Sequence, residues 1–330
     1  MIYREIGTSG IMASAIAFGA WAIGGGSWWG ETDDAESVNA LHAAIDSGIN
    51  FIDTAPVYGF GRSEEVVGNA IAGKRDKVII ATKAGLWWND ERGSLFFNHA
   101  DGPVVRRSLR PDTIAIEIED SLRRLKTDYI DLYQTHWQAV EPENTPIEDT
   151  MAALLKLKDS GKIRAIGVSN CSPEQMDEYK KTGEISANQP RYSMLDRTIE
   201  NELLPYCIKN KISILAYSPL EQGLLTGKIT MESSFSKDEF RSNLNWMKPI
   251  NRQKVINLLN SWDYLKNKYN CTTSQLVIAW TISQPGITFA LCGARKVYQI
   301  EDNVKAADII LTDEDILQMR KDIESNCIAE

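Results

Sequence analysis

Short apolar runs alternate along the chain with longer segments in which apolar residues recur at the spacing of a helix. The short runs are typical of buried strands, and the longer segments predict amphipathic helices. Most helical segments begin at a capping residue or a proline, and several end near a glycine, which are the expected boundary signals. The eight predicted core strands are 16–19, 51–52, 78–81, 129–133, 163–168, 186–189, 212–216 and 287–291.

Helical segments separate these strands without a linker-like break, so we predict a single domain over residues 1–330. The alternation of strand and helix favours a (β/α)8 TIM barrel over an open doubly wound sheet. An open sheet that binds a dinucleotide would carry GxGxxG after its first strand, but the glycines at 24–26 lead into two tryptophans instead. We also expect an N-terminal hairpin starting at residues 2–6 and extra C-terminal helices, the last over residues 312–323.

The composition indicates a globular protein with an ordinary core. Apolar residues make up 43% of the chain and the net charge is −9, which argues against nucleic acid or an anionic membrane as a partner. No apolar run approaches the ~20 residues of a membrane span, and the first residues lack the apolar core of a signal peptide. We therefore expect a cytoplasmic protein without a metal site, and the sequence is compatible with an oligomer. The five widely spaced cysteines, expected to be reduced thiols, are Cys171, Cys207, Cys271, Cys292 and Cys327.

Four polar side chains follow the ends of successive predicted strands. Asp53 ends the second strand, and Tyr58 lies in the next loop. Lys83 ends the third strand, and His136 follows the fourth. A parallel barrel places its chemistry at these ends, so we expect the four side chains to share one site.

These four groups together suit proton donation to a carbonyl oxygen. An ammonium beside a phenol favours the phenolate and lowers the phenol pKa from about 10. A carboxylate would hold the ammonium in place, and an imidazole would donate a hydrogen bond or relay a proton. None of the four supplies electrons, so a bound hydride donor is implied.

Each of these residues taken alone has a simpler interpretation. Lys83 could form a Schiff base as in barrel aldolases, or lie on the surface. Asp53 could cap a helix or form an ion pair. Tyr58 could pack within its loop, and His136 could be a satisfied structural group. The combination of all four at strand ends favours a shared catalytic role.

Six motifs resemble, in order, those of the aldo-keto reductases along nearly the whole chain. They are GINFIDTAPVYGFGRSEEVVG, VIIATK, SLRRLKTDYIDLYQTHW, GKIRAIGVSN, AYSPLEQGLLTGK and GARKVYQIEDN. The resemblance implies a catalytic tetrad in which Tyr58 is the general acid, Lys83 lowers its pKa and Asp53 has an orienting role. His136 would assist proton transfer and orient the substrate. The family binds NADPH in extended form across the barrel mouth, without a Rossmann fold.

The same resemblance assigns residues to the cofactor. Ser169, Asn170 and Gln189 match the contacts to the nicotinamide carboxamide, and Tyr217 matches the residue that stacks on the nicotinamide ring. The backbone of 218–225 matches the segment that wraps the pyrophosphate, a role that suits a donor-rich loop with a glycine. The further positions assigned to the cofactor are Ala20, Trp21, Asp53, Ser218, Pro219, Leu220, Gln222, Gly223, Leu225, Lys228, Gly293, Ala294, Arg295, Gln299, Asp302 and Asn303.

The turn after the last predicted strand bears on the choice of dinucleotide. Well-known members carry Lys-Ser and a later Arg there, whereas this chain has Arg295, Lys296 and then Gln299. A guanidinium can form a fork with a 2′-phosphate, and Gln299 can bond an adenine or a ribose. Lys296 could instead belong to a solvated basic turn. Because this version resembles a bacterial-type subgroup of NADPH users, we expect NADPH or NADP+ in preference to NADH.

Tryptophans concentrate in the loops that would surround the barrel mouth. Their flat faces suit sugar rings as well as aromatic or steroid carbonyls, and polar neighbours in the loops favour a sugar, a polyol or a related carbohydrate carbonyl. Several of these tryptophans could instead only pack the loops. The candidate substrate contacts are Trp21, Trp29, Trp87, Trp88 and Trp137.

The predicted function is hydride transfer between a nicotinamide cofactor and a small carbonyl or alcohol substrate. Three other hypotheses stay open. Channel β-subunits share this fold and tetrad and act partly as sensors, although the apolar docking face that such a role needs is not evident. A Schiff-base aldolase would use Lys83. A sugar or inositol dehydrogenase would run the tetrad in reverse, with Tyr58 as base.

Overall fold

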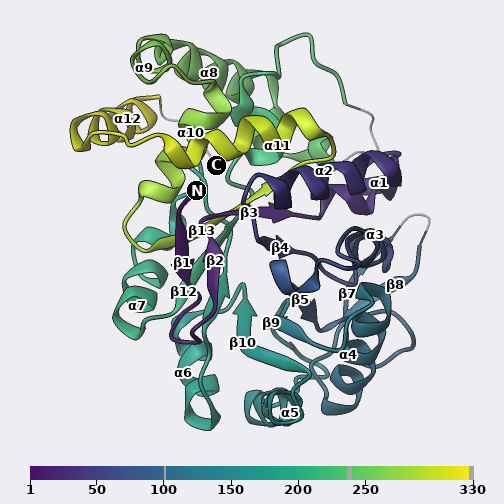
Figure 1. The fold of residues 1–330 in the computed structure, drawn as a ribbon. Coiled ribbons are helices and arrows are strands. Elements are labelled where there is room, and N and C mark those ends of the chain that lie inside the picture. Colours follow the sequence, from purple (N-terminus) through teal and green to yellow (C-terminus); the bar gives the residue numbers. More distant parts are fainter. Residues whose placement is uncertain (100–101, 236–239, 327–330) are drawn as a thin grey trace.

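Eight parallel strands close into a barrel surrounded by helices in the computed structural model, which describes residues 1–99, 102–235 and 240–326 (Figure 1). Each barrel strand pairs with the barrel strands that come before and after it in the chain, and the last strand pairs with the first. The barrel strands are β3 (Ile16–Gly19), β4 (Phe51–Asp53), β5 (Ile79–Ala84), β9 (Ile130–Thr135), β10 (Ile163–Ser169), β11 (Ala187–Gln189), β12 (Ser213–Tyr217) and β13 (Ile287–Gly293). The predicted (β/α)8 architecture is confirmed.

Helices of the outer layer begin where the capping signals predict. The Asp33 carboxylate accepts from the backbone amides of Ala35 and Glu36, and Ser172 and Thr272 form capping boxes. The α-helices are α1 (Gly26–Trp29), α2 (Asp34–Asp46), α3 (Arg62–Ala70), α4 (Pro111–Leu125), α5 (Ile147–Asp159), α6 (Pro173–Thr182), α7 (Leu203–Asn210), α8 (Pro249–Ser261), α9 (Asp263–Tyr269), α10 (Thr273–Ser283), α11 (Val297–Val304) and α12 (Asp313–Ser325).

Short 3-10 helices occupy several connections that were expected to be irregular, including the described part of the long polar loop after β12. Residues 249–269 form two helices, α8 and α9, which are divided at Trp262. The 3-10 helices are η1 (Ala22–Gly24), η2 (Arg75–Lys77), η3 (Thr198–Glu200), η4 (Glu221–Thr226), η5 (Phe240–Asn243), η6 (Asn245–Met247) and η7 (Lys305–Asp308).

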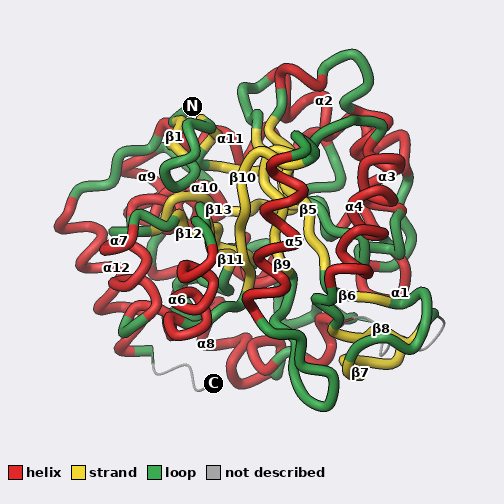
Figure 2. Tube along the Cα trace, turned by 90° about the horizontal axis from the view of Figure 1, so that it is seen from below, coloured by secondary structure: helices red, strands yellow, loops and turns green. Residues whose placement is uncertain are grey.

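Two small antiparallel sheets lie outside the barrel. The predicted N-terminal hairpin consists of β1 (Tyr3–Glu5) and β2 (Met12–Ser14). The second sheet, which the sequence did not predict, has the order β6-β8-β7 and is an insertion between β5 and α4. Figure 2 shows its strands grouped beside α1 at one end of the barrel. Its strands are β6 (Leu86–Trp87), β7 (Ser94–Asn98) and β8 (Val104–Arg107).

The interior of the barrel is a packed apolar core, closed at the bottom by the N-terminal hairpin. Phe51 and Phe289 meet inside it with ring centroids 5.1 Å apart, and Ile6 and Ile11 from the hairpin join the same cluster. A larger apolar cluster fills the space between the strands and the helices. Side chains alternate between these two cores along each strand, so polar groups at strand ends emerge at the open mouth.

None of the described helices is long and apolar enough to cross a membrane. Four of the five cysteines are unpaired thiols, and Cys327 lies outside the described residues.

Glu117 on α4 is a fully buried carboxyl group beneath the loop that follows β5. Its two oxygens accept hydrogen bonds from the backbone amide of Gly85, at 2.9 and 3.2 Å. Burial raises the pKa of Glu117 to about 8, although the Gly85 amide and the charge of Arg124 act in the opposite direction, and the charge of Glu64 adds to the rise. The folded protein therefore keeps a proton on this carboxyl group that the unfolded chain releases.

We predict that the free energy of unfolding falls as the pH rises, because the buried Glu117 carboxyl group stabilises the fold only while it is protonated. The folded-state pKa of about 8 lies above the ordinary value of 4.5, so the stabilising contribution is complete below pH 4.5 and is lost as the pH rises through 8. The slope between these values is at most about 1.4 kcal/mol per pH unit. Glu117→Gln should flatten the decline in the free energy of unfolding between pH 5 and 8, measured by urea titration. Glu65→Gln, at an exposed position of α3, should leave the decline unchanged. Equal slopes for wild type and Glu117→Gln would contradict the assignment.

Candidate active site

All eight barrel strands end at or next to a residue that the sequence assigned to the site. Strand registers place these ends at one level, because Gly19 pairs with both Asp53 and Gly293, and Ser169 pairs with Gln189. The residues at the ends of the strands or directly next to them are Ala20, Asp53, Lys83, His136, Ser169, Gln189, Tyr217 and Gly293. The structure therefore brings them together around one mouth.

A buried ion pair lies at the centre of this mouth. The Lys83 ammonium lies 2.7 Å from Oδ1 of Asp53 and also donates to the carbonyl of Thr54 at 2.8 Å. The second oxygen of Asp53 accepts from the side-chain amides of Gln189, at 2.8 Å, and Gln134, at 3.2 Å. Gln134 was not identified from the sequence. A polar residue within the buried run of β9 was the available signal for it.

Tyr58 lies against this pair, but its phenol is not acidified by it. Nζ of Lys83 lies 5.1 Å from the centroid of the Tyr58 ring. Burial raises the pKa of Tyr58 well above 10, and the negative charge of Asp53 raises it further. Burial also lowers the pKa of Lys83, against the charge of Asp53. That Lys83 lowers the pKa of Tyr58 stays a prediction, because burial is the larger effect in this structure and raises that pKa.

His136 faces Tyr58 edge to face, with ring centroids 5.8 Å apart and planes at 84°. Burial lowers the pKa of His136 well below 6.5, and the charge of Lys83 lowers it further. The imidazole is therefore neutral at neutral pH. Of the two roles that the sequence left open, this favours donation of a hydrogen bond over a proton relay.

A close crossing of two glycine loops holds the backbone of Tyr58. A Cβ atom added to Gly59, whose φ is +64°, would lie 2.3 Å from the carbonyl oxygen of Gly24. A Cβ atom on Gly24 would lie 2.7 Å from the carbonyl carbon of Tyr58. The run of glycines after β3 thus serves as a support for the tyrosine loop, a role that the sequence analysis did not assign.

The residues assigned to the nicotinamide form one hydrogen-bonded network. Tyr217 donates its hydroxyl to Oδ1 of Asn170 at 3.0 Å, and the Asn170 amide donates to the His136 carbonyl at 3.2 Å. The Ser169 hydroxyl donates to the carbonyl of Gln189 at 2.7 Å. Because the Gln189 side chain bonds to Asp53, this network is continuous with the ion pair.

The segment after β12 has the backbone geometry of an anion-binding loop. Ser218, Gln222 and Gly223 have φ values of 59°, 50° and 99°, and left-handed residues of this kind can turn backbone amides toward one concave face. Oε1 of Gln222 is buried without a hydrogen-bond partner among the described residues. Leu225 is buried in the apolar core, so only its backbone could face a ligand. These features fit the pyrophosphate of a dinucleotide.

The turn after β13 carries two cations, Arg295 and Lys296. Arg295 donates to the carbonyl of Trp29 at 3.1 Å, and Lys296 lies 3.6 Å from the carboxylate of Glu36. The Gln299 side chain accepts from the backbone amides of Arg295 and Lys296, at 2.8 and 3.1 Å. Gln299 thus caps α11 through its side-chain oxygen, and the bond from its side chain to an adenine or a ribose stays a prediction.

Asp302, Asn303 and Lys228 lie together beside α10. Oδ1 of Asp302 accepts from Thr272 at 2.9 Å and from Gln275 at 2.7 Å. Nζ of Lys228 lies 3.9 Å from the other Asp302 oxygen and is largely exposed, whereas Asn303 is buried. Hydrogen bonds within the protein hold Asp302 in place, and Lys228 is the exposed cation beside it.

Four of the five candidate tryptophans form an aromatic wall beside Tyr58. The ring centroid of Trp21 lies 6.2 Å from that of Tyr58 and 5.1 Å from that of Trp29. Trp88 and Trp137 pack into the same apolar cluster as Tyr58, on the face of the inserted sheet. These partly buried rings are placed to enclose a substrate.

Trp87 does not belong to this wall. It is only 2% exposed, its Nε1 donates to Asp90 at 2.7 Å, and the Arg92 guanidinium lies over its ring. The expectation that Trp87 contacts substrate is wrong, because adjacent residues of a strand face opposite ways and its neighbour Leu86 takes the inward face.

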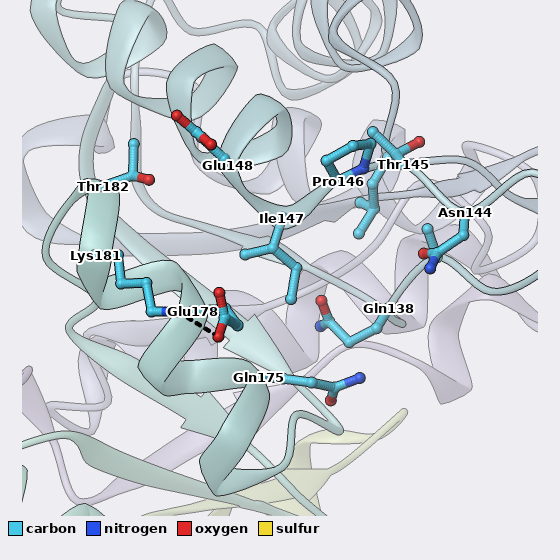
Figure 3. Close-up of a pocket in the computed structure, with 12 residues that line it drawn as sticks. Gln138, Asn144, Thr145, Pro146, Ile147, Glu148, Gln175, Glu178, Lys181 and Thr182 are labelled. Carbon is cyan, nitrogen blue, oxygen red and sulfur yellow. Dashed lines mark hydrogen bonds and ion pairs between the residues drawn. The ribbon is translucent and has the colours of Figure 1, made fainter.

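A separate hollow of about 490 Å³ lies between α5 and α6 (Figure 3). Gln138, Asn144, Gln175 and Glu178 are among its lining residues, and none of the predicted site residues is. Gln138 donates to the carbonyl of Ser169, at 3.4 Å, so the hollow adjoins the site from outside. No group of three or more potential metal-ligating side chains occurs within the described part of the chain.

Comparison with known proteins gives one consistent result. The model of the Aldo/keto reductase family matches residues 15–324. An NADH-specific methylglyoxal reductase of Escherichia coli is 44% identical, over 97% of this chain and 98% of that protein. A glycerol dehydrogenase structure from Gluconobacter oxydans superposes with a TM-score of 0.89 at 39% identity, covering 99% of this chain and 97% of that one.

A third relative was solved with a bound dinucleotide. This aldo/keto reductase from Klebsiella pneumoniae, in complex with NADP and acetate, has a TM-score of 0.69 at 31% identity, over 94% of this chain and 91% of that one. With the barrel, the strand-end residues and these similarities in agreement, the chain belongs to the aldo/keto reductase family of oxidoreductases.

Proposed function

We propose that this chain reduces a small carbonyl compound with a nicotinamide dinucleotide, with Tyr58 as the general acid, and oxidises the alcohol in the reverse direction. The observation that carries the proposal is the buried Asp53–Lys83 pair with Tyr58 and His136 packed against it at the barrel mouth. Ser169, Asn170 and Tyr217 and the left-handed loop after β12 would hold the cofactor, which supplies the hydride.

The raised pKa of Tyr58 suits an acid in the reduction direction. A phenol that stays protonated at neutral pH gives up its proton only when negative charge develops on the carbonyl oxygen. The Lys83 ammonium then lies near the phenolate that forms, and Asp53 keeps the ammonium in place. The neutral imidazole of His136 would donate a hydrogen bond to the same carbonyl oxygen and orient the substrate.

The structure offers less support for a Schiff-base aldolase. A lysine nucleophile needs a free amine directed at the substrate carbonyl. Nζ of Lys83 is instead buried and bonded to Asp53 and to the carbonyl of Thr54, so attack would require both bonds to break.

Tyr58→Phe is the direct test of this assignment. It should lower kcat for carbonyl reduction by roughly 10²- to 10⁴-fold, the usual contribution of a general acid. Dissociation constants for NADPH and NADH, from cofactor fluorescence, should stay within about threefold of wild type, since the phenol hydroxyl contributes little to ground-state binding. Tyr264→Phe, on an exposed helix, is the matched control. A Tyr58→Phe variant that retained most of its turnover would rule out this mechanism.

Arg295 supports NADPH as the preferred cofactor. The Arg295 guanidinium forms no ion pair with any described residue and donates to the Trp29 carbonyl. Its remaining N–H groups are therefore available for a 2′-phosphate. Lys296, by contrast, lies near Glu36. The relatives differ in their cofactor, since one is named as NADH-specific and another was solved with NADP.

We predict that Arg295→Gln weakens NADPH binding by roughly 10- to 100-fold, the range for a charge-assisted hydrogen bond, and changes NADH binding by less than about threefold. Fluorescence titration of both cofactors gives the two dissociation constants. Lys305→Gln, just beyond α11 and exposed, should change neither. Tighter binding of NADH by the wild type, or equal losses for both cofactors in Arg295→Gln, would show that the 2′-phosphate is not bound here.

We further propose a small oxygenated carbonyl as substrate, of the sugar or polyol type. The partly buried tryptophans around Tyr58 support this, as does the likeness to a methylglyoxal reductase and a glycerol dehydrogenase. A panel of methylglyoxal, D-glyceraldehyde, ketosugars, inositols and benzaldehyde should give the highest kcat/KM for an oxygenated member. Turnover of benzaldehyde alone would contradict the proposal.

A further inference from the structure

The inserted sheet and the residues next to it carry several arginines that bond to other groups of the protein. Arg92 bonds to Asp90 and to Asp112, and Arg110 bonds to Asp112. Arg106 on β8 donates to the carbonyl of Gly93. Each of these side chains therefore has a clear structural role in the insertion.

Arg107, the next residue on β8, differs from all of them. It forms neither a hydrogen bond nor an ion pair with any described residue, and its Nε is buried without a partner. Its guanidinium carbon lies 4.3 Å from the centroid of the Phe96 ring and 4.9 Å from that of Trp137. Burial lowers the pKa of Arg107, and no carboxylate opposes that effect.

The strand register directs Arg107 toward the barrel mouth. Arg107 pairs with Leu86 across the sheet, and residues in register share a face. Val105, two positions earlier on β8, lies on this face as well. Leu86 and Val105 belong to the apolar cluster against which Tyr58 packs. Arg107 thus lies on the wall of the candidate substrate site.

A partly buried cation without a counterion is costly, and an unpaired buried donor calls for an explanation. The aromatic contacts offset part of that cost and hold the plane of the guanidinium in one orientation. Its outer N–H groups then remain free and aligned, which is the arrangement that binds a planar carboxylate or a phosphate through two hydrogen bonds.

We propose that Arg107 is a specificity-determining residue that binds the carboxylate or phosphate group of an anionic carbonyl substrate whose reacting carbonyl lies at Tyr58. The proposal rests on the carbonyl reductase function and narrows its substrate class from small oxygenated carbonyls to those that carry an oxyanion. Arg106, on the opposite face of the same strand, has no part in this recognition.

The test compares each anionic aldehyde with a neutral partner of similar shape. Succinic semialdehyde with butanal and 4-carboxybenzaldehyde with 4-methylbenzaldehyde report on a carboxylate. D-Glyceraldehyde 3-phosphate with D-glyceraldehyde reports on a phosphate. The kcat/KM ratio within each pair is measured for wild type, Arg107→Gln, Arg107→Lys and Arg106→Gln, so the pair with the highest ratio identifies the anion.

In at least one pair the wild type should prefer the anionic member by roughly tenfold or more. Arg107→Gln should lower kcat/KM for that member by roughly 10- to 100-fold and change its neutral partner by less than about threefold. Arg107→Lys should restore part of the loss, and Arg106→Gln should behave like wild type. An equal loss of kcat/KM on both members of each pair would show that Arg107 has only a structural role and would overturn the proposal. No loss of kcat/KM on any member would overturn it as well.

A binding measurement separates this proposal from the proposed reductase function. Succinate and inorganic phosphate are titrated into wild type and Arg107→Gln, with tryptophan fluorescence as the readout because Trp137 stacks on the guanidinium. Saturable binding in wild type that Arg107→Gln weakens would support the anion site even if no aldehyde is reduced. Failure of both anions to bind, together with no anionic preference in turnover, would overturn it.

Discussion

The candidate site depends on one buried ion pair, between Asp53 and Lys83. Two charges removed from water are stable together only when further hydrogen bonds satisfy their remaining lone pairs and protons. Here the carbonyl of Thr54 accepts from the ammonium, and two glutamine amides donate to the carboxylate. Removal of either partner would leave an isolated buried charge, at a cost of about 3–5 kcal/mol. The pair is therefore a constraint on the fold as well as part of the proposed chemistry.

The same pair sets the protonation of its neighbours. Burial and the negative charge of Asp53 keep the proton on Tyr58, while burial and the Lys83 charge keep His136 neutral. The mouth thus combines a protonated phenol with a neutral imidazole, next to partly buried tryptophans. Such an environment suits proton delivery to an oxygen that becomes negative during hydride transfer.

Most of the barrel and the position of the tetrad could be predicted from the sequence, because both follow from local patterns. Apolar runs between helical segments define eight strands, and Asp53, Lys83 and His136 occur where those runs end. The inserted sheet was missed because its strands are short and bulged and do not alternate cleanly. Trp87 was misassigned because its direction depends on the register of that sheet. The isolation of Arg107 could not be seen at all, since a missing partner is visible only in three dimensions.

The central claim is that hydride moves from a nicotinamide bound at this mouth to a carbonyl carbon. It is tested most directly with NADPH and NADH deuterated at C4 of the nicotinamide, each face in turn, and mass spectrometry of the alcohol product. The account predicts one deuterium on the carbinol carbon from one face of the ring and none from the other. An alcohol without deuterium from either face would contradict it.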